Sequence, residues 1–302
     1  MSTDFAAGPV RVRVPATSAN LGPGFDALGL ALALHDELTA EVVDAGLAID
    51  VEGAGAEEVP RDESHLVVRA MRHAFSELGI EPNGIRLHCR NAIPHSRGLG
   101  SSAAAIVGGL LLARALVTDG TERLPDGAAL ALAANLEGHP DNVAPCLFGG
   151  LTIAWLQDGA ARAVRRDVDP AIVPVVLVPP FTASTELARG LLPDAVPHAD
   201  AAFVAGRAAL LVAAMTGTPQ ALFDATEDRL HQSYRSSAMP EAYDLVKRLR
   251  GAGQPAVISG AGPTVLVLAR GAAEAQAAAE QAPDGWEGRV LAVDLPGARQ
   301  LF

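Results

Sequence analysis

The sequence predicts an α/β protein of two domains, and three observations support this prediction. Runs of alternating or continuous apolar residues, which are typical of strands, recur between longer segments with helical spacing. The composition changes near residues 158–169, and Pro170 and Pro174 follow the change. The chain has 302 residues and is 49% hydrophobic, which suffices for one large or two medium domains. We therefore expect an N-terminal domain over residues 1–165 and a C-terminal domain over residues 166–302.

The first half of the chain alternates predicted strands with predicted helices. Alternation over Val10–Val14 predicts an edge strand, and the small polar residues, prolines and glycines of Pro15–Gly24 predict a loop. After Ser64, a plausible N-cap, apolar residues keep helical spacing until Gly79 ends the helix. The other elements expected here are strands at 28–34, 38–43, 47–51, 85–93 and 150–156, and helices at 102–117 and 126–137.

The second half predicts a different arrangement. Strand patterns lie at 175–178, 256–259, 265–268 and 290–294, and helical patterns at 200–216, 219–224, 240–250 and 272–281. When the first two of these helices are set aside, the order is β-α-β-β-α-β, which is the order of the ferredoxin-like fold. We therefore expect a ferredoxin-like arrangement in this half.

Bulk composition excludes several classes of function. Lys247 is the only lysine among 23 basic residues, and its surroundings indicate an exposed helix face. This excludes a P-loop NTPase, a protein kinase and a Schiff-base enzyme, which all need a lysine at their centre. The net charge of −12 argues against a nucleic-acid partner. The two cysteines, Cys89 and Cys146, cannot form a disulfide framework or a cysteine-rich zinc site.

The sequence also lacks signals for export or membrane insertion. The N-terminal residues show no basic region followed by an apolar core, so no secretory signal is expected. The most apolar stretch, residues 103–113, is too short to cross a bilayer. We expect a cytoplasmic protein with neither a membrane nor a nucleic-acid partner.

The segment IPHSRGLGSSAAA, which begins at Ile93, has the character of an anion site. A predicted strand ends, glycines let the backbone approach a ligand, and Ser101 and Ser102 open a helix whose first amides are free. A serine hydroxyl at this position can also ligate Mg²⁺. A rival interpretation is a dinucleotide fingerprint at Gly98-x-Gly100-x-x-Ala103, with Asp119 as the ribose acid. Residues 94–97 count against it because they separate the strand from the glycines, and Asp119 lies in a predicted loop.

Two further segments carry polar groups suited to a site. In EGHPDNVAP, Glu137 ends an almost wholly apolar helix, where a carboxylate needs a partner such as a metal ion. We expect His139 to make a local hydrogen bond rather than to bind a metal, because no second histidine lies at ligand spacing. The third segment, SGAGPT from Ser259, is by itself a hairpin turn whose glycines could also let the backbone approach a ligand.

Four segments together resemble a known family. PATSANLGPGFDALGLAL, IPHSRGLGSSAA, EGHPDNVAP and ISGAGPTVLVL occur in this order between residues 15 and 268 and resemble the GHMP family of small-molecule kinases. The first of them, with STELAR and YRSSAMPEAY, resembles the members that phosphorylate L-homoserine. The resemblance implies an N-terminal domain like domain 2 of ribosomal protein S5 and a ferredoxin-like C-terminal domain, with the active site between them.

The resemblance also implies roles for particular residues. ATP would bind the loop formed by Pro94, His95, Ser96, Arg97, Gly98, Leu99, Gly100, Ser101 and Ser102, with its phosphates on the helix N-terminus. Mg²⁺ would be held by Ser102 and Glu137. Homoserine would contact Asn20, Asp26, Asn142, Arg189 and Arg235, and Thr185 would lie near the reacting hydroxyl. Family relatives that phosphorylate mevalonate carry a lysine on the first strand, which VRVRVP lacks.

These expectations agree with the chemistry of the residues. An amino-acid carboxylate favours a planar bidentate donor, which Arg189 and Arg235 supply, and its ammonium group favours an anion such as Asp26. Phosphoryl transfer depends mainly on positioning and charge neutralisation, so a strong general base is not required. The alternative for Arg189 and for Arg235 is a surface ion pair, which is the commoner role of a single arginine. We expect a homodimer with ATP and Mg²⁺ as cofactors; another alcohol kinase of the family, a nicotinamide-dependent oxidoreductase and a non-catalytic binding protein remain alternatives.

Overall fold

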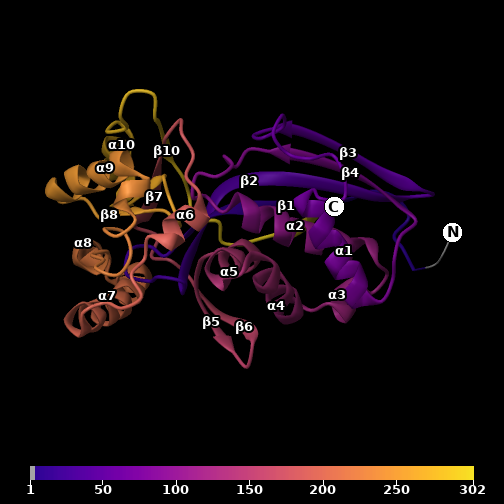
Figure 1. The fold of residues 1–302 in the computed structure, drawn as a ribbon, viewed down its shortest axis with the longest axis horizontal. Coiled ribbons are helices and arrows are strands. Elements are labelled where there is room, and N and C mark those ends of the chain that lie inside the picture. The colour runs from indigo at the N-terminus through magenta and orange to yellow at the C-terminus, as the bar shows by residue number, and fades with distance from the viewer. Residues whose placement is uncertain (1–3) are drawn as a thin grey trace.

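Two β-sheets organise the chain, and each forms the centre of one lobe (Figure 1). The computed structural model describes residues 4–302. The larger lobe holds the first sheet with α1 to α5, and the smaller lobe holds the second sheet with α7 to α10 (Figure 1). The C-terminal strand returns to pair with the first strand of the larger lobe. The predicted α/β class is therefore confirmed.

The sheet of the larger lobe is mixed, with most of its strand pairs antiparallel. Its order is β11-β1-β2-β4-β3, and the hairpin of β5 and β6 joins it through β2. Only β3 and β4 pair in parallel among the described strands. The strands are β1 Val10–Ala19, β2 Leu28–Val43, β3 Gly46–Gly53, β4 Gly84–Asn91, β5 Leu151–Gln157, β6 Ala160–Arg166 and β11 Arg299–Leu301.

Three strand predictions in this lobe are wrong. β1 is not an edge strand, because β2 and β11 pair with it on both sides. It also continues through residues 15–19, which were predicted as loop, and its register shifts at Pro15 because proline cannot donate a ladder hydrogen bond. The two strands predicted at 28–34 and 38–43 form the single strand β2. Pairing with neighbours from distant parts of the chain overrides these local signals.

Helices cover one face of this sheet, and most residues of α2 are buried. The helices are α1 Leu66–Leu78, α2 Ser101–Leu116, α3 Gly120–Arg123, α4 Asp126–Glu137 and α5 Pro140–Phe148. α2 packs against α1, β1, α4 and α5, which explains why it is apolar on all sides. The prediction missed α5, where Pro140 occupies the first turn, the position at which a helix tolerates proline. The N-cap of α1 is His65 rather than Ser64.

The smaller lobe has the predicted β-α-β-β-α-β order. Its sheet runs β10-β7-β9-β8, with β7 Ile172–Val178, β8 Ala256–Ile258, β9 Val265–Arg270 and β10 Glu287–Val290. Its helices are α6 Thr185–Gly190, α7 His198–Gly217, α8 Leu222–Ala225, α9 Pro240–Gly251 and α10 Gly271–Ala279, with short 3₁₀ turns at Pro219–Ala221 and Ser236–Ala238. The strand predicted at 290–294 ends at Val290, and β11 rather than this strand is the last one. The domain boundary near residue 166 stays a prediction.

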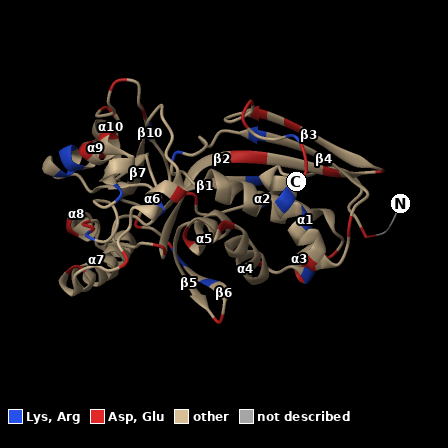
Figure 2. Ribbon diagram, viewed as in Figure 1, with Lys and Arg blue, Asp and Glu red and all other residues tan. Residues whose placement is uncertain are grey.

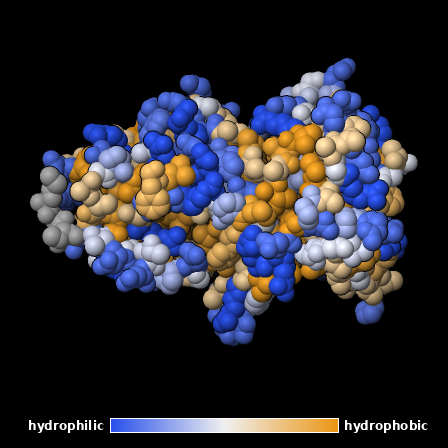
Figure 3. Space-filling model, turned by 180° about the vertical axis from the view of Figure 1, so that it is seen from behind, coloured by the Kyte–Doolittle hydropathy of each residue, from blue (hydrophilic) through white to orange (hydrophobic). Residues whose placement is uncertain are grey.

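Charged residues of both signs occur in both lobes. Figure 2 shows Lys and Arg interspersed with Asp and Glu on both lobes. On the rear face, apolar surface gathers where the lobes meet (Figure 3). Among residues 4–302 one helix, α7, is long and apolar enough to cross a membrane, with a mean hydropathy of 1.4. One such helix is weak evidence for a span, and α7 also carries Asp200 and Arg207.

Candidate active site

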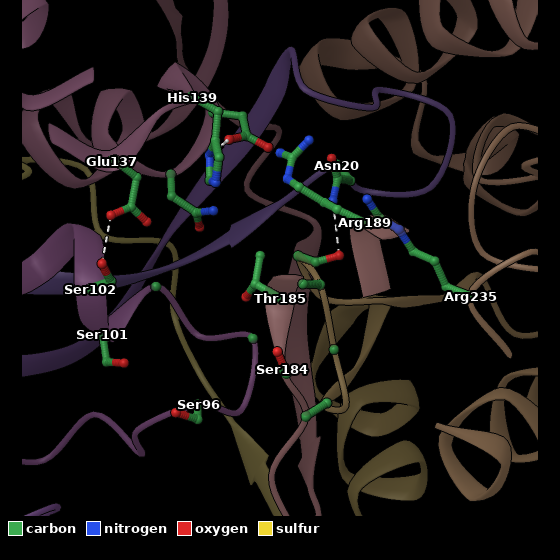
Figure 4. Close-up of a pocket in the computed structure, with 18 residues that line it drawn as sticks. Asn20, Ser96, Ser101, Ser102, Glu137, His139, Ser184, Thr185, Arg189 and Arg235 are labelled. Carbon is green, nitrogen blue, oxygen red and sulfur yellow. Dashed lines mark hydrogen bonds and ion pairs between the residues drawn. The ribbon is translucent and has the colours of Figure 1, made fainter. Parts of the chain in front are cut away.

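A cavity of about 520 Å³ lies between the lobes and collects most of the predicted site residues. Figure 4 shows that Ser102 at the start of α2 faces Glu137 at the end of α4, with His139 on the same side of the cavity. Thr185 and Arg189 of α6 and Arg235 approach from the smaller lobe (Figure 4). The turn between β8 and β9, residues 260–262, lines the remaining wall. Segments separated by more than 100 residues therefore meet in one site.

The glycines of the loop before α2 fit it closely against its neighbours. Gly98 and Gly100 have φ values of 75° and 69°, which side-chain-bearing residues rarely adopt. A Cβ atom on Gly98 would lie 2.3 Å from the Ser259 carbonyl oxygen, and one on Gly100 would lie 1.9 Å from Thr17 Oγ1. No side chain caps α2, and the first amides of a helix have no partner inside it. These amides and the helix dipole make the predicted anion site.

Hydrogen bonds between the lobes hold this loop in place. Ser259 Oγ donates to the Gly98 carbonyl oxygen at 2.6 Å and lies 2.8 Å from Ser18 Oγ. The Thr264 amide donates to the Arg97 carbonyl oxygen at 3.2 Å. The SGAGPT segment is thus a hairpin turn and also a support for the loop.

The nine residues predicted to bind ATP divide into two groups. Five of them line the cavity: Ser96, Gly98, Gly100, Ser101 and Ser102. The others point elsewhere: the Leu99 side chain is buried in the core, and the Arg97 guanidinium donates to the carbonyl oxygens of Pro179 and Pro180. His95 lines an adjacent cavity, and Pro94 precedes it in the chain. The site assignment itself stays a prediction.

Ser102 and Glu137 form a pair of oxygen donors at the edge of the cavity. Ser102 Oγ donates to Glu137 Oε2 at 2.6 Å (Figure 4). Burial, with the nearby Asp141 carboxylate, raises the pKa of Glu137, whereas the hydrogen bond from Ser102 lowers it. Burial makes ionisation of the Glu137 carboxyl group costly, and a bound cation would stabilise its charged form. Carboxylate and hydroxyl oxygens are ligands that a hard cation prefers. The residues present therefore fit Mg²⁺.

His139 and Asp141 lie beside this pair. His139 Nδ1 is 2.6 Å from Asp141 Oδ1, as expected for a local hydrogen-bonding role. Burial lowers the pKa of His139, but the hydrogen bond and the negative charge of Asp141 together raise it by more. The net pKa shift is therefore upward. Asn142 Oδ1 accepts a hydrogen bond from Thr17 Oγ1 at 2.9 Å, which leaves its amide NH₂ group to donate into the cavity.

Arg189, which lines the opposite end of the cavity, forms a bidentate ion pair with Asp26, a predicted site residue that is not itself part of the lining. Arg189 Nη2 is 2.7 Å from Asp26 Oδ1, and Nη1 is 3.2 Å from Oδ2. The Asp26 amide donates to Asn20 Oδ1, and Asn20 Nδ2 donates to the Gly260 carbonyl oxygen. The sequence predicted that Arg189 would bind a substrate carboxylate and Asp26 a substrate ammonium group, and in the structure these two side chains pair with each other.

Arg235 is the most unusual charge in the site. Its residue is 3% exposed, and its Nε has no hydrogen-bond partner among residues 4–302. Burial, followed by repulsion from Arg189, lowers its pKa. The guanidinium lies 4.8 Å from the centroid of the Phe25 ring. A buried cation without a paired anion indicates that an anionic ligand belongs here.

A second cavity of about 240 Å³ opens beside the loop and shares Ser96, Ser101 and Ser102 with the first. Most of its lining is apolar, with side chains of Leu38, Val59, Pro60, Leu66, Val67 and Ala105. His65 Nδ1 is buried here without a partner in the described chain, and burial lowers the pKa of His65, so its imidazole is neutral. Sequence reasoning missed His65; its position just before the predicted helix gave no functional signal.

The topology excludes the dinucleotide alternative. A dinucleotide fingerprint requires a parallel sheet with a tight turn from strand to helix. β4 pairs in parallel with β3 but antiparallel with β2, so the sheet is mixed, and residues 92–100 separate β4 from α2. Asp119 adopts a left-handed conformation at the start of α3 rather than the end of a strand. The Gly98–Ala103 segment is therefore not a nicotinamide-binding turn.

Comparison with known proteins identifies the class. The description "GHMP kinases N terminal domain" matches residues 65–150, and "GHMP kinases C terminal" matches residues 202–288. The chain belongs to the GHMP kinase family, as its motifs predicted. The Leishmania major mevalonate kinase complexed with R-mevalonate shares the fold, with a TM-score of 0.69 at 16% identity over 98% of this chain and 99% of that one.

Within the family, the similarity is to one group. Homoserine kinase of Streptomyces avermitilis is 58% identical over 297 residues, which cover 98% of this chain and 97% of that protein. Homoserine kinase of Clavibacter michiganensis is 53% identical over 294 residues, 96% and 93% of the two chains. The crystal structure of homoserine kinase from Cytophaga hutchinsonii has a TM-score of 0.84 at 26% identity over all of both chains. The chain groups with the homoserine kinases.

Proposed function

We propose that this chain transfers the γ-phosphoryl group of ATP to the side-chain hydroxyl of L-homoserine, which yields O-phospho-L-homoserine and ADP. The buried Arg235 guanidinium is the observation that carries this proposal. Together with Arg189 and Asp26 it offers two cations and one anion, which match the carboxylate and the ammonium group of an amino acid. Sugar and mevalonate acceptors lack this pair of opposite charges.

The nucleotide follows from the two adjoining cavities. The amides at the start of α2 would bind its phosphates, since an uncapped helix N-terminus attracts anions. The apolar second cavity would then take the base, because it opens directly beside Ser101 and Ser102. A neutral His65 imidazole can both donate and accept hydrogen bonds there. This assigns the base to a pocket that the sequence did not reveal.

Ser102 and Glu137 would hold Mg²⁺. When bound, the ion would neutralise charge on the phosphate oxygens. Without it, the Glu137 carboxylate would repel the incoming phosphates, so the ionised residue makes sense only together with a cation.

The remaining residues position the acceptor. Arg235 and Arg189 would bind the acceptor carboxylate, and Asp26 would bind its ammonium group. The side-chain amide of Asn142, on α5, would donate a hydrogen bond to the acceptor. The acceptor hydroxyl would then lie toward Thr185 and the loop before α2 for an in-line attack on the γ-phosphorus. Placement of the two reactants accounts for most of the rate in such a transfer, so no strong base is needed.

The first strand argues against the mevalonate alternative. Arg13 of β1 pairs with Glu37 of β2 at 2.6 Å and does not reach the cavity. We further propose that the enzyme acts in the cytoplasm, where ATP and amino acids are available, without a membrane or nucleic acid. The homodimer stays a prediction.

A coupled assay of ADP release tests the function directly. With Mg-ATP, turnover should depend on L-homoserine and exceed turnover of mevalonate and galactose by more than 100-fold. Turnover with mevalonate or galactose at the homoserine rate would contradict the proposal. Omission of Mg²⁺ should abolish turnover, and addition of Mg²⁺ should restore it.

A further inference from the structure

Phe25 lies close to both arginines that we assign to the substrate carboxylate. Its ring centroid is 4.8 Å from Cζ of Arg235 and 5.8 Å from Cζ of Arg189. The two guanidiniums repel each other, and Arg235 has no ion pair among residues 4–302 to hold it in place. An aromatic face is electrically negative and attracts a cation, most strongly where water is excluded. The ring is therefore placed to offset this repulsion.

We propose that Phe25 is a positioning residue for the acceptor: its ring holds Arg235 beside Arg189, so that both guanidiniums face the substrate carboxylate. This inference rests on the proposed function. Without the ring, Arg235 would move toward the aspartates that already attract it, of which Asp26 and Asp228 are the strongest. A shift toward Asp26 would add a second arginine to the carboxylate that pairs with Arg189 and is assigned to the substrate ammonium.

The Phe25 ring also stacks on the imidazole ring of His231. The two rings stack with centroids 4.9 Å apart and an angle of 27° between their planes. His231 Nε2 donates to the Gly22 carbonyl oxygen at 2.8 Å, which fixes the imidazole. Burial lowers the pKa of His231, so the stacked ring is neutral and adds no third positive charge. Phe25 therefore has one neutral neighbour and two cationic ones.

Local backbone geometry couples these groups. The Arg235 amide donates to the His231 carbonyl oxygen, so the two side chains leave one turn on the same side and both reach Phe25. On the other chain segment, Asp26 has a φ of 54° and its amide donates to Asn20 Oδ1. This bend lets Phe25 face both arginines while the next residue pairs with Arg189.

Kinetics of the full-length enzyme test the proposal with three variants at this position. Phe25→Leu and Phe25→Met remove the aromatic face and keep an apolar side chain, and Phe25→Tyr keeps the face. We expect Leu and Met to raise KM for L-homoserine about ten-fold, equivalent to about 1.4 kcal/mol. KM for ATP should change less than two-fold, and Tyr should stay within two-fold of the unchanged enzyme for both substrates.

Phe203 supplies a matched control outside the site. Its ring lies 4.7 Å from Cζ of Arg207 and 3.7 Å from Cζ of Arg229, so it also contacts two arginines. Phe203→Leu should lower the melting temperature without a change in KM for L-homoserine. An equal rise in KM for Phe203→Leu would show a general effect of lost packing and would overturn the proposal.

A second readout isolates the carboxylate. The compound 3-aminopropan-1-ol keeps the hydroxyl and amine of homoserine and lacks the carboxylate, and it can be measured as a substrate or as a competitive inhibitor. Phe25→Leu should reduce the preference for homoserine over this compound about ten-fold. An unchanged preference, or unfolding of both the Leu and the Met variant, would overturn the proposal. Failure of the unchanged enzyme to phosphorylate homoserine would instead refute the proposed function.

Discussion

The Arg235→Met substitution separates stability from function at one residue. The Arg235 side chain is buried without an ion pair to any of residues 4–302, and burial, followed by repulsion from Arg189, lowers its pKa. Methionine fills a similar volume and carries no charge. We therefore expect the variant to be more stable than the unchanged protein in the absence of substrate, and far less active.

The magnitudes follow from the contacts. Removing one partner of a buried charge pair costs about 2–5 kcal/mol. Because Arg189 would also bind the homoserine carboxylate, we expect a cost near the lower end of this range. This corresponds to a fall of roughly 30- to 100-fold in kcat/KM for homoserine. An uncompensated buried charge destabilises by several kcal/mol, and attraction to the Phe25 ring offsets about 2 kcal/mol. The net gain in the free energy of unfolding should be about 1–2 kcal/mol, a rise in melting temperature of roughly 2–6 °C.

The assay combines steady-state kinetics with thermal denaturation, with and without homoserine. Arg229→Met is the control, because Arg229 also lies over a phenylalanine ring but is 47% exposed and paired with Asp200 and Glu227. It should alter neither KM for homoserine nor the stabilisation that homoserine gives. A lower melting temperature for Arg235→Met, together with unchanged kinetics, would refute the reasoning and assign Arg235 a structural role.

Three further predictions concern the metal site, the base pocket and a buried acid. Glu137→Gln should lower kcat by about 100-fold or more with little change in melting temperature, since it removes the negative charge that would bind Mg²⁺; near-normal turnover would exclude that role. His65→Leu should raise KM for ATP about ten-fold and leave KM for homoserine unchanged, and the reverse pattern in steady-state kinetics would contradict the base pocket. Burial raises the pKa of Asp36 from 3.8 to about 6, although the amides of Ala92 and Ile93 donate to it. The folded form therefore binds more protons than the unfolded form between about pH 4 and pH 6, so the free energy of unfolding should fall by about 2 kcal/mol between pH 4 and pH 8. Urea unfolding of Asp36→Asn should lack this component, and identical pH profiles for the two proteins would show that Asp36 is not perturbed.

The local features of the site could be predicted from the sequence. The loop before α2 depends on glycines with positive φ, on serines at a helix start and on the dipole of that helix. These properties belong to neighbouring residues, so the segment from Ile93 to Ala105 carries them wherever it lies. The same holds for α4, whose end at Gly138 leaves Glu137 as its last residue.

The parts that failed depend on contacts between distant residues. β1 is a central strand because β11, almost 300 residues away, pairs with it. α5 was missed because Pro140 and Gly138 signal a stop, yet the helix begins again at once and packs against α4 and β5. Tertiary packing in each case outweighed the local preference that the prediction had used.

The sequence by itself determined the α/β class, the GHMP kinase motifs and the residue types able to bind phosphate, a cation and an amino acid. The tertiary structure alone decided that Asp26 pairs with Arg189 and that Phe25 contacts both Arg189 and Arg235. The reason is that a motif fixes the geometry of adjacent residues, whereas the position of one charge relative to another more than 100 residues away follows from how the two lobes fold and pack.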